Sequence, residues 1–301
     1  MKKSNKLFGT VDQKLLDHSF WDACSDKDFK KYISLLEMDE ETLKKYTSHL
    51  LDSFNEKKNC SKCDNLDACK NSVIGYCYEA VKDGNLLNFS YVACSKMQEK
   101  MKNDAYKKNI ELFDMPKDIE NANLKDLYKD DKARLPILKY FKEFMSHYKD
   151  EDKPKGIYLN GSFGSGKTYL VAALFNELAK KGNKCALIYY PEFLRSLKAS
   201  FSTDYSDRFD YIKKVDLLLL DDIGAENCSS WSRDEVLGPI LQYRMEEHLP
   251  TFFTSNLTLE ELENALAITN NGADKVKARR IIERIKQLTI PLELISKNRR
   301  H

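Results

Sequence analysis

Short apolar runs alternate with amphipathic segments in the second half of the chain. The apolar runs are predicted to be strands at residues 156–160, 185–190, 215–221 and 251–255. The amphipathic segments between them are predicted to be helices at residues 167–180, 192–200 and 232–247. Strands that are apolar along most of their length are buried on both faces, which is typical of a parallel sheet covered by helices. We therefore expect an α/β fold with a parallel sheet.

The first part of the chain has a different pattern. Between residues 12 and 54, apolar residues recur at helical spacing, which predicts two or three short helices. Further helices are expected at residues 133–148 and, with a basic surface, at residues 274–287. The pattern divides the chain into a helical and cysteine-rich domain, a linker with a leading helix, and the α/β core, at residues 1–105, 106–155 and 156–301.

The composition is that of a folded protein. The chain has 301 residues, of which 42% are hydrophobic and 32% charged, so the disordered and collagen-like classes are excluded. Purely aliphatic runs such as residues 217–220 are far shorter than the ~20 residues that span a bilayer. A secretory signal has an apolar stretch after its first basic residues, and no such stretch follows the first lysines of this chain. We expect a cytoplasmic protein without membrane contact. The net charge of +2 does not decide whether it binds nucleic acid.

A phosphate-binding loop is predicted between the first strand of the core and the helix that follows. The motif G-x-x-x-x-G-K-[ST] is met by Gly161, Ser162, Phe163, Gly164, Ser165, Gly166, Lys167 and Thr168. Glycines allow successive backbone N–H groups to point at phosphate oxygens, and the helix N-terminus adds partial positive charge. Lys167 is expected to reach the β- and γ-phosphates of ATP, and the Thr168 hydroxyl to ligate Mg²⁺.

Polar residues end the third and fourth strands predicted in the core. Asp221 and Asp222 close an apolar strand, where a carboxylate projects into the crevice that holds a nucleotide. Asp221 is expected to hold Mg²⁺ through water, and Asp222 to position or activate the attacking water. Asn256 follows the next strand and is a candidate to orient that water. Asn256 can also be a turn or cap residue, although Thr258 is the better cap for the helix that follows.

Five of the eight cysteines lie between residues 60 and 94, spaced Cys60-x₂-Cys63-x₅-Cys69-x₇-Cys77-x₁₆-Cys94. A tetrahedral structural zinc site needs four thiolates, and a C-x-x-C pair supplies two of them on one tight turn. Zinc would also supply folding energy to a segment that has few large apolar residues. We expect Cys60 and Cys63 to be ligands, with the other three cysteines competing for two places.

Four segments together resemble the ATPase domain of bacterial replicative helicase loaders of the DnaC/DnaI type, a branch of the AAA+ ATPases. They are, in chain order, GIYLNGSFGSGKTYLVAALFNEL, LLLLDDIGAE, TFFTSN and KARRIIERI. The cysteine-rich segment resembles the zinc-binding N-terminal domain of the DnaI subtype. The resemblance implies a protein that delivers the hexameric replicative helicase onto single-stranded DNA in replication initiation and restart, together with other primosomal proteins. It implies ATP, Mg²⁺ and Zn²⁺ as cofactors, and self-association with ATP.

The resemblance also implies roles for individual residues. Arg280 and Arg284 match the arginine-finger helix of the family, and Arg299 or Arg300 matches its C-terminal sensing arginine. The zinc ligands implied are Cys60, Cys63, Cys69 and Cys94, with Cys77 as the alternate, because residues 75–78 look like a turn.

The chain departs from many AAA+ proteins in the acidic pair that ends the predicted strand. Many of those proteins have Asp-Glu there, whereas this chain has Asp221-Asp222. Asp222 is one methylene shorter than Glu, so we expect weak, switch-like hydrolysis of ATP.

Three other functions fit parts of the sequence. A transposition helper shares the ATPase branch but would lack the cysteine-rich domain. A small-molecule kinase would need an arginine-rich lid, and a nucleotide-binding adaptor would not turn over ATP.

Arg195 and Lys198, with Phe193 and Phe201 nearby, are candidates to bind single-stranded DNA, because basic groups neutralise phosphates and aromatic rings stack on bases. The alternative is that both phenylalanine rings belong to the hydrophobic core.

Overall fold

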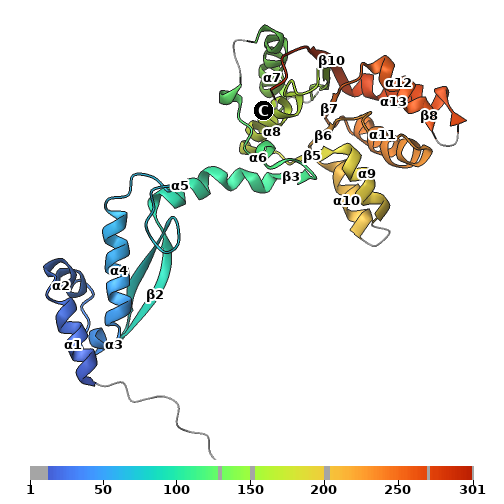
Figure 1. Ribbon diagram of the computed structural model, residues 1–301. Coiled ribbons are helices and arrows are strands. Elements are labelled where there is room, and N and C mark those ends of the chain that lie inside the picture. Colours follow the sequence, from blue (N-terminus) through green and yellow to red (C-terminus); the bar gives the residue numbers. More distant parts are fainter. Residues whose placement is uncertain (1–12, 128–130, 150–152, 200–203, 270–271, 300–301) are drawn as a thin grey trace, which may run out of the picture. The chain divides into compact units, whose positions relative to one another are not determined.

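The computed structural model describes residues 13–127, 131–149, 153–199, 204–269 and 272–299. Two compact units are distinguished along the chain, Met1–Ala105 and Tyr106–His301 (Figure 1). Within the described ranges, no helix combines the length and the apolar character that a membrane span requires.

The N-terminal unit consists of helices and a β-hairpin. Its helices are α1 (Gln13–Ala23), α2 (Lys27–Ser34), α3 (Glu40–Lys45), α4 (Thr47–Cys60) and α5 (Ser95–Asp104). The hairpin is formed by the antiparallel strands β1 (Tyr76–Asp83) and β2 (Leu86–Ala93). Phe29 and Leu50 are fully buried in the core of this unit, and Ala80 and Leu87 from the hairpin belong to the same core. The helical character expected between residues 12 and 54 is confirmed, but four helices begin there rather than two or three.

The hairpin is not among the elements expected from the sequence, and the structure corrects the interpretation of residues 75–78 as a turn. Gly75 has a φ of +80°, but Tyr76 already begins β1 and pairs with Ala93. Ala80 and Leu87 of the hairpin are buried in the apolar core of this unit, and Phe89 packs against that core.

The C-terminal unit is built on a parallel six-stranded sheet of order β10-β4-β7-β6-β5-β3. Its strands are β3 (Ile110–Phe113), β4 (Gly156–Gly161), β5 (Cys185–Tyr189), β6 (Leu217–Asp221), β7 (Thr251–Ser255) and β10 (Thr289–Leu294). The four central strands lie where the apolar runs predict them. The two edge strands, β3 and β10, are not predicted, because β3 is short and β10 contains Pro291, which is tolerated at an edge.

Helices cover both faces of this sheet. They are α6 (Lys117–Glu120), α7 (Leu135–His147), α8 (Lys167–Lys180), α9 (Tyr190–Ala199), α10 (Asp204–Lys214), α11 (Gly238–Glu246), α12 (Leu259–Ala267) and α13 (Lys275–Leu288). A π-helical turn, Ser232–Leu237, leads into α11, and the short strands β8 (Ile268–Thr269) and β9 (Gly272–Ala273) lie between α12 and α13.

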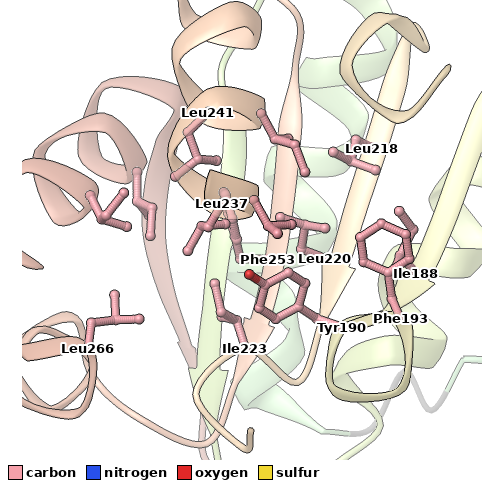
Figure 2. Packing of buried hydrophobic residues seen from close by; sticks show 14 of the residues in the cluster. Ile188, Tyr190, Phe193, Leu218, Leu220, Ile223, Leu237, Leu241, Phe253 and Leu266 are labelled. Carbon is pink, nitrogen blue, oxygen red and sulfur yellow. The ribbon is translucent and has the colours of Figure 1, made fainter. Parts of the chain in front are cut away.

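Alternate residues of the central strands enter different cores. Leu218 and Leu220 of β6 pack with Phe253, Leu237 and Leu241 in one core, which Figure 2 shows. The intervening leucines, Leu217 and Leu219, belong to a second core with residues of α7 and α8. Because both faces of these strands are buried, nearly every position in them is apolar, and they form continuous apolar runs in the sequence. The sheet therefore holds the polar residues at its strand ends in fixed positions.

Candidate nucleotide site

The predicted phosphate loop connects β4 to α8. Gly161 ends β4 and Lys167 begins α8, so the loop runs directly into a helix N-terminus. Gly164 and Gly166 have φ values of +69° and +86°, which side chains with a Cβ rarely adopt. The glycines of the motif are therefore required by the backbone of the loop.

A cavity of about 730 Å³ lies at this loop. The residues that line it come from the phosphate loop, from the ends of β6 and β7, and from the segment that precedes α7. They include Gly164, Ser165, Gly166, Lys167, Thr168, Asp221, Asp222, Thr254, Asn256, Arg134 and Arg299. The structure thus brings together the loop, both acids, Asn256 and Arg299, as the sequence predicts.

Lys167 is held at the loop by several acceptors. Its Nζ donates hydrogen bonds of 2.9 Å to the carbonyl oxygens of Gly161 and Ser162 and to Oδ1 of Asn256. The residue is only 8% exposed. A lysine in this position presents its ammonium group to the floor of the cavity, where an anionic phosphate would replace part of this bonding.

Asp221 is buried at the end of β6 and accepts two hydroxyl donors. Thr168 Oγ1 donates to Asp221 Oδ1 over 2.6 Å, and Thr254 Oγ1 donates to the same oxygen. Burial raises the pKa of Asp221, and the two hydroxyl donors oppose that rise. A carboxylate beside a threonine hydroxyl is the oxygen donor set that Mg²⁺ prefers, so the residues present fit that ion. Thr254 is a site residue that the sequence analysis missed.

Asp222 follows with a strained backbone. Its φ of +57° is uncommon for a residue other than glycine. Its N–H donates to Thr254 Oγ1 (2.9 Å), and its carboxylate Oδ1 accepts from Asn256 Nδ2 (2.8 Å). Strain of this kind is found at functional sites, where surrounding contacts maintain it.

Asn256 is not the N-cap of the next helix. Thr258 caps α12, because its side chain accepts from the N–H of Glu261 and the Glu261 carboxylate accepts from the Thr258 N–H. The Asn256 side chain instead joins Lys167 to Asp222. The alternative interpretation of Asn256 as a cap residue is therefore wrong.

The two arginines of α13 lie outside the cavity lining. Arg280 is exposed, whereas Arg284 is partly buried and donates to the Gly238 carbonyl over 3.0 Å. Next to them, Arg279 forms an ion pair with Glu263 at 3.6 Å. The structure therefore does not bring Arg280 or Arg284 to the phosphate loop of their own chain. Arg300 lies outside the described residues.

The helix considered for single-stranded DNA is α9. Phe193 is 2% exposed and belongs to the core (Figure 2), so it is not available to stack on a base. Arg195 forms an ion pair with Glu192 at 2.6 Å, and Lys198 lies 5.6 Å from the ring centre of Trp231. Phe201 lies outside the described residues. Of the two interpretations that the sequence leaves open, the one that places Phe193 in the core is confirmed.

The N-terminal unit places several cysteines around the start of β1. The Cys77 thiol contacts the Cys60 thiol, and burial together with this contact raises the pKa of Cys77 to about 12. The Cys69 sulfur accepts from the Gly75 N–H over 3.4 Å, and the Cys94 N–H donates to the Gly75 carbonyl over 2.9 Å.

These cysteines do not assemble a complete metal site. Within the described part of the chain, no three His, Cys, Asp or Glu side chains lie close enough together to hold an ion. The set Cys60, Cys63, Cys69 and Cys94 is thus not brought together, and the Cys63 thiol donates instead to the Asn65 carbonyl over 3.0 Å. The turn that argued against Cys77 is absent, since Cys77 lies within β1.

Comparisons with known proteins agree with this geometry. The sequence model of a family described as "IstB-like ATP binding protein" matches residues 131–289. The replicative helicase loader DnaI of Bacillus subtilis is 34% identical over 296 residues, which cover 96% of this chain and 94% of that protein.

Two solved structures are also similar. A crystal structure of DnaI has 46% identity and a TM-score of 0.58, and the match covers 65% of this chain and 99% of that one. A Streptococcus pyogenes protein solved as a candidate primosome component has 36% identity and a TM-score of 0.57, over 66% of this chain and 100% of that one.

Proposed function

This chain belongs to the family of bacterial replicative helicase loaders of the DnaI type, and on that premise we propose that it loads the hexameric replicative helicase onto single-stranded DNA in an ATP-dependent way. The observation that carries the proposal is the match to a helicase loader along nearly the whole chain, N-terminal unit included. A helicase partner acts on the chromosome, so we place the protein in the cytoplasm.

The nucleotide site supports ATP binding by the phosphate loop. Lys167 would exchange its bonds to the loop carbonyls for bonds to the β- and γ-phosphates, and the backbone of residues 164–168 would hold the remaining oxygens. Thr168 and Asp221 would hold Mg²⁺, which supplies charge neutralisation at the phosphates when it is bound.

Hydrolysis would depend on Asp222 and Asn256. The Asp222 carboxylate is the candidate to position or deprotonate the attacking water, and Asn256 holds that carboxylate through Oδ1. Because Asp222 has a short side chain that already accepts this hydrogen bond, we propose slow, switch-like turnover rather than a fast motor.

Self-association with ATP would complete the site. Arg280 is exposed on α13 and lies away from its own cavity, so it is available to a nucleotide held by a neighbouring copy. A guanidinium supplied in this way stabilises charge on the transferred phosphoryl group. Arg284, bonded to the Gly238 carbonyl, would instead hold α13 in place.

From the spacing of the cysteines, we propose that the N-terminal unit binds zinc. The hydrogen bond from Asn71 Nδ2 to the Cys60 sulfur (3.2 Å) suits a thiolate ligand. The contact between Cys60 and Cys77 favours Cys77 as a ligand. Cys94 directly follows β2, and its N–H donates to the Gly75 carbonyl, which keeps it near the start of β1. We therefore propose Cys60, Cys63, Cys77 and Cys94, in place of a set with Cys69.

Contacts with single-stranded DNA and with other primosomal proteins are proposed from the family alone. Without Phe193, the candidate DNA contacts on α9 are reduced to Arg195 and Lys198, both of which already have partners within the chain. The helix α13 carries six basic residues and one acidic residue, and this excess of positive charge makes it the better candidate for contacts with phosphate groups.

A transposition helper remains the second candidate for the ATPase unit. The family match at residues 131–289 covers that unit alone, whereas the match to the helicase loader also covers the N-terminal unit. Size-exclusion chromatography with light scattering, on this protein mixed with the host helicase with and without ATP, separates the two. A complex supports a loader, and its absence in both conditions contradicts one.

An adaptor that binds ATP without turnover is the third candidate. Phosphate release from ATP by the purified protein, measured with the Lys167→Ala variant as the background, tests it. Release above that background supports an ATPase, and release equal to it supports the adaptor.

A further inference from the structure

The chain segment after β10 lies against the phosphate loop. The Ser162 N–H donates to the Leu294 carbonyl over 3.2 Å, and the Arg299 N–H donates to the Gly164 carbonyl over 2.8 Å. A Cβ on Gly164 would lie only 2.0 Å from Oδ1 of Asn298. We call residues 295–299 the strap. It closely covers the loop backbone that is expected to bind phosphate.

The strap is tied down by the carboxylate of Asp131, a residue just before α7. Asp131 Oδ2 accepts from the Ser296 hydroxyl and, over 3.4 Å, from the guanidinium NH2 of Arg299. Figure 1 shows the dark red segment after β10 beside α7. Hydrogen bonds from Ser296, Arg299 and Arg134 hold the pKa of Asp131 below its usual value, as expected of an ionised acceptor.

The same carboxylate holds a second arginine against the loop. Arg134 Nε lies 3.4 Å from Asp131 Oδ2, and Arg134 NH2 donates to the Ser165 carbonyl over 2.7 Å. Arg134 is 3% exposed, so its guanidinium has little freedom to reorient. Both Arg134 and Arg299 line the nucleotide cavity, whereas Asp131 does not.

We propose that Asp131 is a positioning residue for nucleotide binding: it orients Arg134 and the strap, and through them the phosphate loop. This inference rests on the proposed binding of ATP at that loop. A guanidinium that is already held in its binding orientation loses less conformational entropy when it binds phosphate. A loop that is already ordered likewise loses little entropy on binding, so the affinity for nucleotide is higher. Without the carboxylate, the strap and Arg299 lose the anchor that holds them at the cavity.

The test measures the affinity of purified full-length protein for a fluorescent ATP analogue in Mg²⁺ buffer. Asp131→Asn keeps the size of the side chain but removes its charge, and we expect affinity to fall about tenfold, the worth of one charge-assisted hydrogen bond. Asp210→Asn, which removes a surface carboxylate paired with Lys213 and Lys214, is the matched control and should bind like wild type.

A double-mutant cycle with Arg299→Ala separates positioning from a general structural role. Because Asp131 is proposed to act through Arg299 as well as through Arg134, Asp131→Asn should cost less affinity in the Arg299→Ala background than in wild type. Strictly additive losses, or wild-type affinity in Asp131→Asn, would overturn the proposal. Should Asp131→Asn fail to fold by circular dichroism, Ser296→Ala removes one bond of the strap without leaving a charge, and is expected to weaken binding severalfold. Unchanged affinity in Ser296→Ala would then overturn it.

Failure of the proposed function has a different signature. If wild type and Lys167→Ala bind the analogue equally, the nucleotide site itself is wrong. If wild type binds, Lys167→Ala does not, and Asp131→Asn matches wild type, only the role of Asp131 is wrong.

Discussion

The amide of Asn256 donates a hydrogen bond of 2.8 Å to the carboxylate of Asp222, although the two residues end different strands. The other end of the same amide accepts from Lys167, so one side chain connects the phosphate-binding lysine to the candidate catalytic carboxylate. A change in the bonding of Lys167 on nucleotide binding would therefore reach Asp222 directly.

Replacement of Asn256 by alanine should reduce ATP hydrolysis by about 100-fold, the usual cost of losing a positioned polar group in a catalytic site. Affinity for ATP should change little, because the substitution leaves in place Lys167 and the loop backbone, the groups proposed to bind the phosphates. Phosphate release and nucleotide affinity are measured on the same preparation, with Asn88→Ala in the N-terminal hairpin as the control. A variant that hydrolyses ATP like wild type would remove Asn256 from the site.

Lys167→Ala should abolish detectable ATP binding while the protein stays folded. The ammonium group is the charge expected on the β- and γ-phosphates, and its partners include two loop carbonyls and the side chain of Asn256. Isothermal titration with ATP is the measurement, and Lys181→Ala, just beyond the end of α8, is the control. Unaltered binding by Lys167→Ala contradicts the phosphate-loop assignment.

Arg280→Ala should lower hydrolysis in assembled protein without changing the ATP affinity of dilute protein, since the exposed guanidinium would act on a neighbour's nucleotide. The neighbouring variant Arg279→Ala, which breaks only the ion pair with Glu263, should keep its activity. Hydrolysis per subunit is measured across a series of protein concentrations. A rate per subunit that is independent of concentration, in both wild type and Arg280→Ala, argues against a shared site.

Zinc should be found at about one equivalent in protein purified under reducing conditions, as a single four-thiolate site requires. Cys77→Ser should lose the metal, because its thiol adjoins Cys60, whereas Cys69→Ser should keep it. Cys24→Ser, outside the cluster, is the control. Metal analysis that finds no zinc in wild type rejects the site, and loss of zinc in Cys69→Ser with retention in Cys77→Ser restores the ligand set with Cys69.

Arg244 should be important for the stability of the C-terminal unit. It is fully buried, and its guanidinium donates to the carbonyls of Ile212, Lys213, Val215 and Pro250 and to the Thr251 hydroxyl. Arg244→Met would leave these acceptors without their donor, at a cost of about 3 kcal/mol or more in the free energy of unfolding. Urea denaturation measures it, and a loss below about 1 kcal/mol contradicts this role.

The parts of the fold that sequence predicts best are those with local patterns. Burial on both faces makes β4 to β7 continuous apolar runs, and the phosphate loop needs glycines and a lysine at set spacing. The strap and its anchor are different, because Ser296 and Asp131 are 165 positions apart and each is an ordinary polar residue in its own segment. The hairpin is a different case, because Leu87 and Phe89 alternate with polar residues and pack on the core of the N-terminal unit, so its signal is local and was overlooked.

Loading itself is tested most directly on circular single-stranded DNA, which offers no end onto which a closed helicase ring can thread. The host helicase is incubated with the circle, with and without this protein and ATP, and helicase that stays on DNA after gel filtration is quantified. The account predicts that wild-type protein with ATP increases the DNA-bound helicase, and that Lys167→Ala does not produce the ATP-dependent increase. Equal amounts of helicase on the circle with and without this protein would contradict a role as a loader.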